Sequence, residues 1–408
     1  MLQLRPILST LRRHRTAALL IVFEIALTCA IVCNAVFLIA NRVERLRFGT
    51  GLVDNELVVV GTHSIGRDAN AAAGTREDLA ALRALPGVRG ADLVVGIPYG
   101  AQMSMSGISM KPAQETPTID AAMYEGDVGL PATLGLKLVA GRGFNAEEIL
   151  EKADVEKDAN YKFAGVVITR AMAERLFPGG DAVGKSIYIF GDEPTRVIGV
   201  VDRLIVSHPD HGDQSDLYSM ILPIRNTFNS GDYVLRTDPG QREHVMKAAV
   251  AALERVNPHR VAQAHKTFED MRGNFYKTDL SMVWLLVGVC VALLVVTAFG
   301  IVGLASFWVQ QRTKMIGTRR ALGATRGQIL RYFQTENLLL TSAGIALGML
   351  GAFGINQWLM TQYELPRLPA LYLPLGALAL WSLGQIAVLA PARRAAALPP
   401  ADAMRGLA

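Results

Sequence analysis

Cysteine, metal-ligand spacing and aromatic-rich basic patches are scarce or absent in this sequence. The chain has 408 residues and three cysteines, Cys29, Cys33 and Cys290, which all lie in apolar runs. The large polar middle of the chain therefore folds without a disulfide, whatever the redox state of its compartment. No stretch has the ligand spacing of a zinc site, and no basic patch is interleaved with aromatic residues. We therefore expect no metal site and no nucleic-acid partner.

Charged residues are absent from the long stretch 280–309, although Asp, Glu, Lys and Arg make up 19% of the whole chain. With 51% hydrophobic residues and a mean hydropathy of +0.27, the chain is too apolar for an ordinary soluble protein. An apolar run of about 20 residues is long enough to cross a bilayer as a helix. Four such runs predict transmembrane helices over 17–40, 280–309, 337–359 and 371–390.

Acidic residues are missing from 310–331, between the second and third predicted spans. The stretch contains six basic residues: Arg312, Lys314, Arg319, Arg320, Arg326 and Arg331. A basic segment between two spans is typical of a cytoplasmic loop, which we place at 310–336. The two ends of the chain, 1–16 and 391–408, are also basic, so we expect both termini in the cytoplasm. The segment 41–279 and the short loop 360–370 then face the outside.

The N-terminal segment 1–16 is expected to lie on the membrane surface as an amphipathic helix. Its apolar residues Leu4, Ile7, Leu8 and Leu11 recur at helical spacing beside arginines. A cleaved signal peptide is the alternative interpretation of the apolar run that follows. That run is longer than a signal-peptide core, and no small-x-small cleavage site precedes Asn41, so we favour an uncleaved anchor.

Short strands and helices alternate within 41–279 and predict an α+β domain. Strands are expected at 57–60, 93–95, 166–168, 187–190, 197–201 and 233–235. Helices are expected at 75–85, 170–177 and 241–256, with Thr75 and Asp78 suited to an N-terminal cap. From Thr267 a helical pattern runs into the second span, which predicts a rigid stalk. The expected fold class is an integral membrane α-helical protein, with one span, an extracytoplasmic α+β domain, and three further spans.

Several residues inside the predicted spans are polar or very small. Gly344, Gly348 and Ala352 form small-xxx-small pairs that suit close helix contact. Glu24 lies about two turns inside the first span, and Gln385 lies in the fourth. An intramembrane carboxylate is costly unless it faces protein or water. Glu24 is therefore either a functional residue or a protonated or hydrogen-bonded contact between helices.

Two motifs suggest an enzyme but do not hold up physically. Residues 179–186 read GGDAVGKS and satisfy the phosphate-loop pattern, but that chemistry needs a strand before the loop and a helix after it. Here a helix is expected before the motif and a strand after it. The acidic, histidine-containing turn at 208–213, with Asp216 nearby, is better explained as a solvated loop than as a metal or acid/base site. No nucleophile set is visible, so we expect a protein that is not itself an enzyme.

The order of spans and domain resembles the MacB/FtsX type of ABC transporter permease. The RRALGA sequence at 319–324 resembles the signature of that family's cytoplasmic loop, and 334–340, with Glu336, resembles the start of its third span. In the outer segment, 138–142 resembles its LxxGR sequence. Further similar blocks are 166–170, 176–178, 183–185 and 197–202, together with the ending 391–396, Pro400 and Arg405.

The resemblance implies a permease subunit of the cell inner membrane, working without a cofactor. A separate cytoplasmic ATPase would hydrolyse ATP, and the permease would move its periplasmic domain and export a substrate. It also implies a second permease subunit, identical or related, and a periplasmic adaptor as a further partner. The residues that it assigns to ATPase coupling are Lys314, Ile316, Gly317, Arg319, Arg320, Ala321, Leu322, Gly323, Ala324 and Arg326. Met315 stands where the family usually has a glutamate, which leaves the tightness of docking open.

Charge alone leaves more than one role for the loop. A cationic, partly apolar segment can bind anionic membrane lipid or an acidic groove on a partner protein. Gly317 and Gly323 divide the stretch into a short helix with defined ends, which favours a protein partner. The alternative function is an ATP-driven regulator of a periplasmic partner, such as a cell-wall hydrolase, without transport. A membrane sensor is a third hypothesis, against which the lack of a signalling domain counts.

Overall fold

The computed structural model of the chain divides into two compact units. One consists of Met1–Val43 with Asp279–Ala408, and the other of Glu44–Thr278. We call them the membrane unit and the outer unit. The structure describes residues 15–64, 70–100, 102–157, 162–209, 214–229, 231–257, 260–363, 369 and 372–397. The predicted surface helix at 1–16, most of the short loop 360–370 and the end of the tail therefore lie largely outside the described residues.

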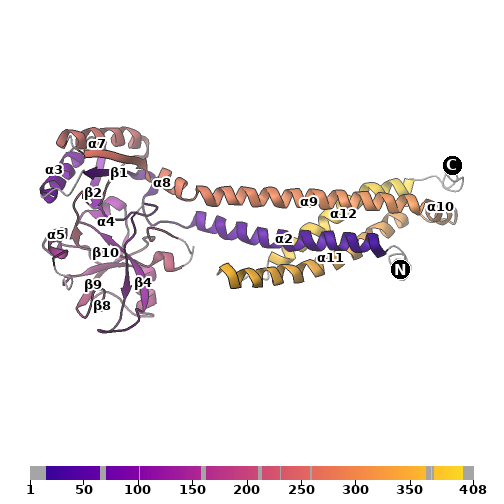
Figure 1. Cartoon of the computed structure of the whole chain (residues 1–408), viewed down its shortest axis with the longest axis horizontal. Helices are drawn as coiled ribbons and strands as arrows, with labels where there is room; N and C mark the ends of the chain where they lie inside the picture. Colours follow the sequence, from indigo (N-terminus) through magenta and orange to yellow (C-terminus); the bar gives the residue numbers. More distant parts are fainter. Residues whose placement is uncertain are drawn as a thin grey trace. The chain divides into compact units, whose positions relative to one another are not determined.

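Among the described residues, the membrane unit contains four long apolar helices and one short helix (Figure 1). The long ones are α2 (Arg15–Arg47), α9 (Lys277–Gln311), α11 (Arg326–Tyr363) and α12 (Tyr372–Ala397); the short one is α10 (Thr313–Ala321). The four long helices are apolar enough to cross a membrane, which confirms the four predicted spans. Their ends extend beyond the predicted spans, because regular helix continues past the apolar core into charged sequence.

Close packing and buried polar contacts hold the four helices together. A Cβ on Gly344 would lie 2.7 Å from Ile25 of α2, and one on Gly348 would lie 2.5 Å from Cys29 Cβ. The small residues of α11 therefore let α2 approach its backbone, as the small-xxx-small pattern predicted. Asn34 Nδ2 of α2 donates to the carbonyl oxygen of Ala352 at 3.2 Å. Such a bond satisfies a polar group that lipid could not.

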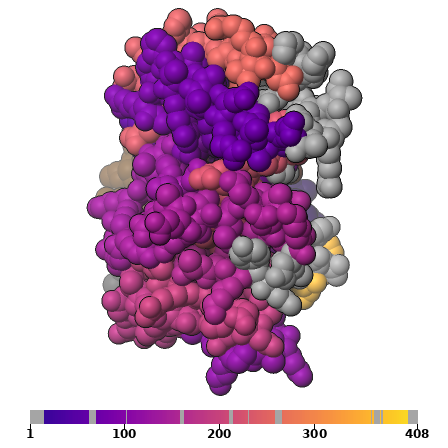
Figure 2. Space-filling model, turned by 90° about the vertical axis from the view of Figure 1, so that its left-hand side faces the viewer, coloured from indigo at the N-terminus to yellow at the C-terminus, as the bar shows by residue number. Residues whose placement is uncertain are grey.

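The outer unit contains a four-stranded antiparallel sheet in the order β13-β1-β12-β2. Its strands are β1 (Leu57–Ser64), β2 (Val88–Val94), β12 (Asp232–Thr237) and β13 (Arg260–Thr267). Helices α3 (Ala71–Arg83) and α7 (Arg242–Val256) cover one face (Figure 1), where Val58, Leu82 and Val245 are fully buried. In Figure 2 the atoms of these two segments adjoin at the top of the view. Alternate residues of β1, such as Leu57, point into the core on the other face.

The second sheet of the outer unit is mixed and follows the order β3-β4-β10-β7-β9-β5, with β8 paired to β9. Its strands are β3 (Met105–Ile108), β4 (Ile119–Glu125), β5 (Leu138–Gly141), β7 (Val166–Thr169), β8 (Ser186–Tyr188), β9 (Pro194–Val201) and β10 (Ser219–Leu222). A separate pair joins β6 (Leu150–Glu151) to β11 (Ile224–Arg225). The remaining helices are α4 (Leu130–Leu134), α5 (Lys152–Val155), α6 (Arg170–Leu176) and α8 (Phe268–Phe275). The short 3-10 turns are Asp54–Glu56, Ala146–Glu148, Gln214–Leu217 and Pro239–Gln241.

Every strand and helix predicted for this domain is present, within a few residues, but two local predictions were wrong. Thr75 and Asp78 do not cap a helix, because they lie buried inside α3. Thr75 Oγ1 donates to the carbonyl oxygen of Ala71, and Asp78 accepts a hydrogen bond from the Tyr233 hydroxyl. The expected continuous stalk helix is also broken: α8 ends at Phe275 and α9 begins at Lys277. Tyr276 separates them.

The phosphate-loop pattern at 179–186 lies between α6 and β8, as the sequence predicted. A helix therefore precedes the motif and a strand follows it. That order is the reverse of the strand–loop–helix arrangement that holds a phosphate at a helix N-terminus. The motif therefore gives no support to nucleotide binding.

Asp92 is a buried acid of the outer unit and lies where β2 meets α3 and α4. The side chain of Asp92 on β2 is 2% exposed and accepts from Arg83 of α3, 2.9 Å away, and from Thr133 of α4. Burial raises the pKa of Asp92 to about 6, although these two donors act in the opposite direction. The charged carboxylate is thus less stable in the folded state than in the unfolded chain.

This burial predicts a pH-dependent stability of the outer unit. A raised carboxyl pKa means that the folded state binds the proton more tightly, so stability falls as the pH rises from about 4 to about 6. The loss should be roughly 3 kcal/mol, and Asp92→Asn should remove it. Hydrogen exchange of the β2 peptide, corrected for the intrinsic exchange rate, measures the effect. Asp120→Asn, at an exposed position of β4, is the matched control and should keep the wild-type slope.

Candidate functional site

The segment between the second and third spans is mostly helical, and α10 is the short helix that the glycines of this stretch predicted, although only Gly323 lies at one of its ends. Gly323 adopts a left-handed conformation with φ of 94°, which favours glycine and ends the helical path of α10. Thr325 then starts α11: its Oγ1 accepts from the Gln328 amide at 3.3 Å, and Gln328 Oε1 accepts from the Thr325 amide at 2.9 Å. This is a capping box. Gly317, in contrast, lies inside α10 and ends nothing.

One side of α10 is fixed to the bundle. Ile316 is buried in an apolar cluster with Val309, Ile329 and Phe333, and with the alanines near the end of α12. Arg320 Nη1 donates to the carbonyl oxygen of Ala396 at 2.9 Å, which ties α10 to α12. Both apolar and polar contacts therefore hold α10 against the ends of α11 and α12.

The other side of α10 is open. Leu322, at its C-terminal end, is 83% exposed, and Lys314, Thr318 and Ala321 are also exposed. A large apolar side chain left in the open beside cations is a common feature of docking surfaces. The helix therefore presents an unpaired surface while its base is held firmly.

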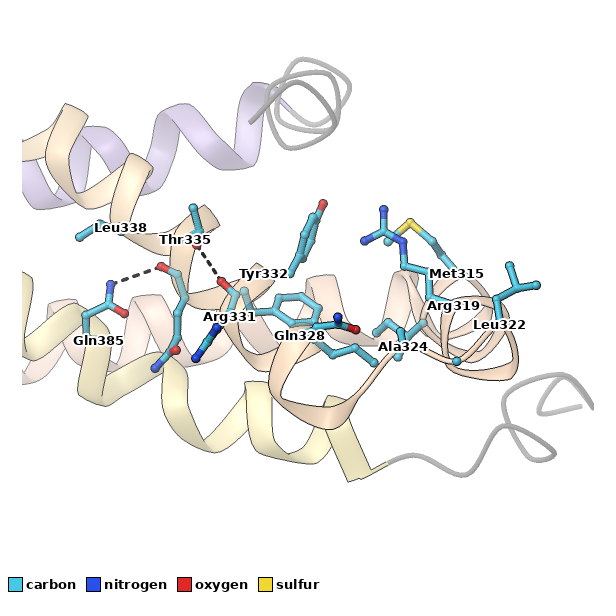
Figure 3. A pocket seen from close by; sticks show the side chains of 15 residues that line it. Met315, Arg319, Leu322, Ala324, Gln328, Arg331, Tyr332, Thr335, Leu338 and Gln385 are labelled. Atoms are coloured by element: carbon cyan, nitrogen blue, oxygen red, sulfur yellow. Dashed lines mark hydrogen bonds between the residues drawn. The ribbon is translucent and has the colours of Figure 1, made fainter. Parts of the chain in front are cut away.

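A groove of about 850 Å³ borders α10, the first turns of α11 and the facing part of α12 (Figure 3). We call it the interfacial groove. The Arg319 guanidinium lies 5.1 Å from the centre of the Tyr332 ring, in a cation–π contact. Gln385 Nε2 donates to the carbonyl oxygen of Gln334 at 3.4 Å and so joins α12 to α11. The interfacial groove is lined by fifteen residues: Met315, Ile316, Arg319, Leu322, Gly323, Ala324, Gln328, Ile329, Arg331, Tyr332, Phe333, Gln334, Thr335, Leu338 and Gln385.

A buried ion pair joins the segment before α10 to α11. Arg312, between α9 and α10, is 7% exposed, and Glu336 of α11 is 2% exposed. Arg312 Nη1 donates to both carboxylate oxygens of Glu336, at 2.9 and 2.7 Å, and the guanidinium also stacks over Trp308. The sequence did not predict this pair. One signal was available, because Glu336 is the only acidic residue between 280 and 363.

The predicted coupling residues do not all face the same way. Lys314, Arg319, Ala321, Leu322, Gly323, Ala324 and Arg326 are exposed or half-buried, whereas Ile316 and Gly317 are buried. Arg320 is half-buried and engaged with α12. The structure therefore separates a subset that can meet a partner from a subset that holds α10 in place.

Glu24, the predicted intramembrane acid, lies against another helix of the bundle. A Cβ placed on Gly300 of α9 would come within 2.5 Å of the Glu24 carboxylate, so that glycine makes room for it. Nearby, Thr28 of α2 and Thr297 of α9 share a buried hydrogen bond of 2.8 Å between their hydroxyls. The arrangement supports the interpretation of Glu24 as a contact between helices.

The outer unit has a joint where its first and last segments meet. Arg272 of α8 donates to the Leu46 carbonyl oxygen at 2.7 Å and to the Asp54 carboxylate at 3.0 Å. The Tyr99 ring packs beside Phe275 and Tyr276, with centres 5.1 and 5.5 Å apart. Arg272 thereby ties the chain entering the outer unit to the helix that leaves it.

The acidic turn at 208–213 lies mostly outside the described residues. His208 itself packs edge-on against the Phe275 ring, 5.9 Å between centres, as part of the joint. Within the described ranges, no group of three or more His, Cys, Asp or Glu side chains is arranged to hold a metal ion.

Two protein families match most of the chain. Residues 21–265 match the MacB-like periplasmic core domain, and residues 287–400 match the FtsX-like permease C-terminal domain. The uncharacterized ABC transporter permease YvrN of Bacillus subtilis is 29% identical over 263 residues, which cover 61% of this chain and 64% of YvrN. The macrolide export ATP-binding/permease protein MacB of Chromobacterium violaceum is 29% identical over 290 residues, covering 66% of this chain and 41% of MacB.

Solved structures also match the outer part of the chain. The extracellular domain of the transporter YknZ from Gram-positive bacteria is 19% identical, with a TM-score of 0.32, and the match covers 51% of this chain and 98% of that domain. The periplasmic region of MacB from Actinobacillus actinomycetemcomitans is 15% identical, also with a TM-score of 0.32, covering 55% of this chain and 94% of that region.

Proposed function

Because the chain belongs to the MacB/FtsX-type family of ABC transporter permeases, we propose that it converts ATP hydrolysis by a separate ATPase into movement of its outer domain. It would serve as a permease subunit, with export or extrusion of a substrate as the outcome. The partner ATPase would dock on α10. A second permease subunit, identical or related, and an adaptor on the outer side complete the proposed assembly.

The proposed topology follows the distribution of basic residues. The 310–336 segment and both termini would face the cytoplasm, and the MacB-like domain would face the periplasm of a cell with an inner membrane. An ATPase in the cytoplasm could then reach α10 directly. Mapping by cysteine labelling should place position 322 and the outer unit on opposite sides of the membrane.

One observation carries this proposal: α10 is fixed on one side and open on the other. Ile316 and Arg320 hold it to the ends of α11 and α12, while Leu322 and Lys314 are exposed. A push on the exposed side would therefore displace the helices and not merely bend a loop. The cationic open face suits an acidic docking groove, in which each exposed charge contact contributes about 1 kcal/mol or less.

In the outer unit, the contacts of Arg272 are the element that we propose would transmit the movement. Arg272 joins the entering chain at Leu46 and Asp54 to α8, so the first and last segments of the domain would move together. In the membrane unit, Arg42 of α2 pairs with Asp279 of α9, which would keep these two helices in step. We propose that these two clamps carry motion to the periplasmic domain.

The proposal predicts that the open face of α10 is needed for the ATPase. Leu322→Asp should reduce ATPase co-purification at least tenfold, because it places an acid on the apolar contact and against an acidic groove. Co-expression with the neighbouring ATPase, followed by affinity purification and quantitative mass spectrometry, measures the result. Membrane insertion should be unchanged, since Leu322 makes little contact with the bundle.

Two control variants make this result interpretable. Leu322→Met keeps an apolar side chain and should retain the ATPase. Arg394→Gln removes an exposed cation from the last turn of α12 that is not among the residues proposed for docking, and it should behave like the wild type. Full co-purification and transport with Leu322→Asp would contradict the proposed docking site.

A further inference from the structure

We propose that the interfacial groove binds an acidic phospholipid, with its phosphate at Arg331 and an acyl chain along Leu338. One end of the groove, at Arg319, Leu322 and the residues 323–324, is shared with the proposed ATPase contact, whereas the lipid would occupy the other end, at Arg331, Leu338 and Gln385. The argument rests on how the groove is oriented, on its charge and on which of its ends each kind of molecule can reach.

The groove follows the axis of a membrane-spanning helix. It extends from Gln328 in the first turn of α11 to Leu338, and on the facing helix it reaches Gln385. Leu338 comes seven positions after Arg331, which corresponds to a rise of roughly 10 Å along the helix. Leu338 and Gln385 belong to the third and fourth spans, whereas Arg331 precedes the apolar part of α11. The groove thus crosses from headgroup depth into the hydrocarbon layer.

The charge of the lining is entirely positive. Arg319 and Arg331 are its two ionisable cations, and no aspartate or glutamate is among the lining residues. The sequence has no acid from 310 to 335 that could neutralise them locally. In Figure 3, Arg331 lies on the side of the groove that holds Gln385 and Leu338, whereas Arg319 of α10 lies at the opposite end. An anionic group with several oxygen acceptors suits Arg331, with Gln334 and Gln385 beside it.

The cationic end of the groove at Arg331 and its apolar end at Leu338 together favour one kind of occupant. A free phosphate ion would leave the exposed Leu338 without a partner, and an acidic protein segment would have to enter the hydrocarbon layer to reach Gln385. An acidic phospholipid has its charge and its acyl chains ordered in the same direction as the groove. Basic pockets between helices at the cytoplasmic face are a known way to hold such headgroups.

Native mass spectrometry of the full chain tests this proposal, using dioleoylphosphatidylglycerol and dioleoylphosphatidylcholine as probes. We expect phosphatidylglycerol to be retained preferentially. Arg331→Gln should weaken that retention about fivefold, the loss of one guanidinium contact near an anionic surface. Arg331 is exposed on the helix surface, so the variant should fold normally. Inorganic phosphate added in excess should not displace the lipid.

Arg394→Gln is the matched control, because it removes an exposed cation from another helix at the same end of the bundle. It should retain phosphatidylglycerol as the wild type does. Equal retention of the two lipids, or unchanged retention in Arg331→Gln, would overturn the proposal. It would also fail if inorganic phosphate competes, or if Arg331→Gln releases the ATPase and leaves the lipid bound. Leu322→Asp changes the end of the groove that is shared with the ATPase contact, and Arg331→Gln changes the lipid end, which is outside the proposed ATPase contact, so the two proposals can fail independently.

Discussion

Replacing Glu336 with alanine should destabilise the helix bundle by about 3–5 kcal/mol, the usual cost of removing one partner from a buried ion pair. Arg312 would keep its charge at a site where it is 7% exposed. No other acidic residue lies between 280 and 363, so the chain offers no nearby replacement. Thermal or denaturant unfolding in detergent, followed by tryptophan fluorescence, measures the loss, since Trp308 contacts the guanidinium.

A double replacement separates the lost pair from the stranded charge. Arg312→Met combined with Glu336→Leu removes both charges and keeps the volume, so it should recover most of the stability. If the double variant is as unstable as Glu336→Ala, the ion pair contributes attraction of its own and the stranded-charge explanation is wrong. The comparison also tests whether the ion pair holds the start of α10 in place, because Arg312 directly precedes that helix.

Replacing Gly348 with isoleucine should separate α2 from α11 and cost about 3 kcal/mol, at the upper end for overpacking. A Cβ at this position would lie 2.5 Å from Cys29 Cβ and 2.6 Å from the Ala26 carbonyl oxygen. Backbone cannot move aside as a side chain can. The Asn34 bond to Ala352, one turn further along α11, should weaken as well. Unfolding in detergent, together with hydrogen exchange of α2, measures both effects.

Gly354 provides a matched control on the same helix. A Cβ added there would meet nothing within 4 Å, so Gly354→Ile should be neutral or slightly stabilising, because isoleucine favours helix more than glycine does. Both variants change helix propensity equally, and only the contact with α2 differs. Similar losses at both positions would show that close approach is not what Gly348 provides.

Hydrophobic runs predicted the four spans well, because the bilayer itself requires long stretches that are predominantly apolar. The outer domain was predicted less completely. Ile119–Glu125, which forms β4, has the sequence IDAAMYE and is buried on both faces over most of its length, so it shows no alternation. Ser219–Leu222, which forms β10, is buried at all four positions. Short strands of this kind carry no periodic signal and are defined by their neighbours in the sheet.

The candidate site was predicted in part. The basic segment is visible in the sequence, whereas the exposure of Leu322 and the pairing of Arg312 with Glu336 depend on how the helices are rotated against each other. Thr325 and Gln328 carry a readable capping signal, which would have placed the start of α11 correctly. Thr75 and Asp78 carried the same kind of signal, but there a bond within the helix to Ala71 and a tertiary contact with Tyr233 prevailed.

The buried contacts between α10 and the end of α12 restrict which residues could change if a relative of this chain were to bind a different ATPase. Ala392 and Ala395 have no exposed surface, so a larger residue at either position would lift α10 from its base. The outward residues carry no such restriction. If an ATPase docks on α10 as proposed, an engineered permease could accept a foreign ATPase by changing a few outward side chains, provided that the buried alanines of α12 and the Arg320 bond to Ala396 are kept.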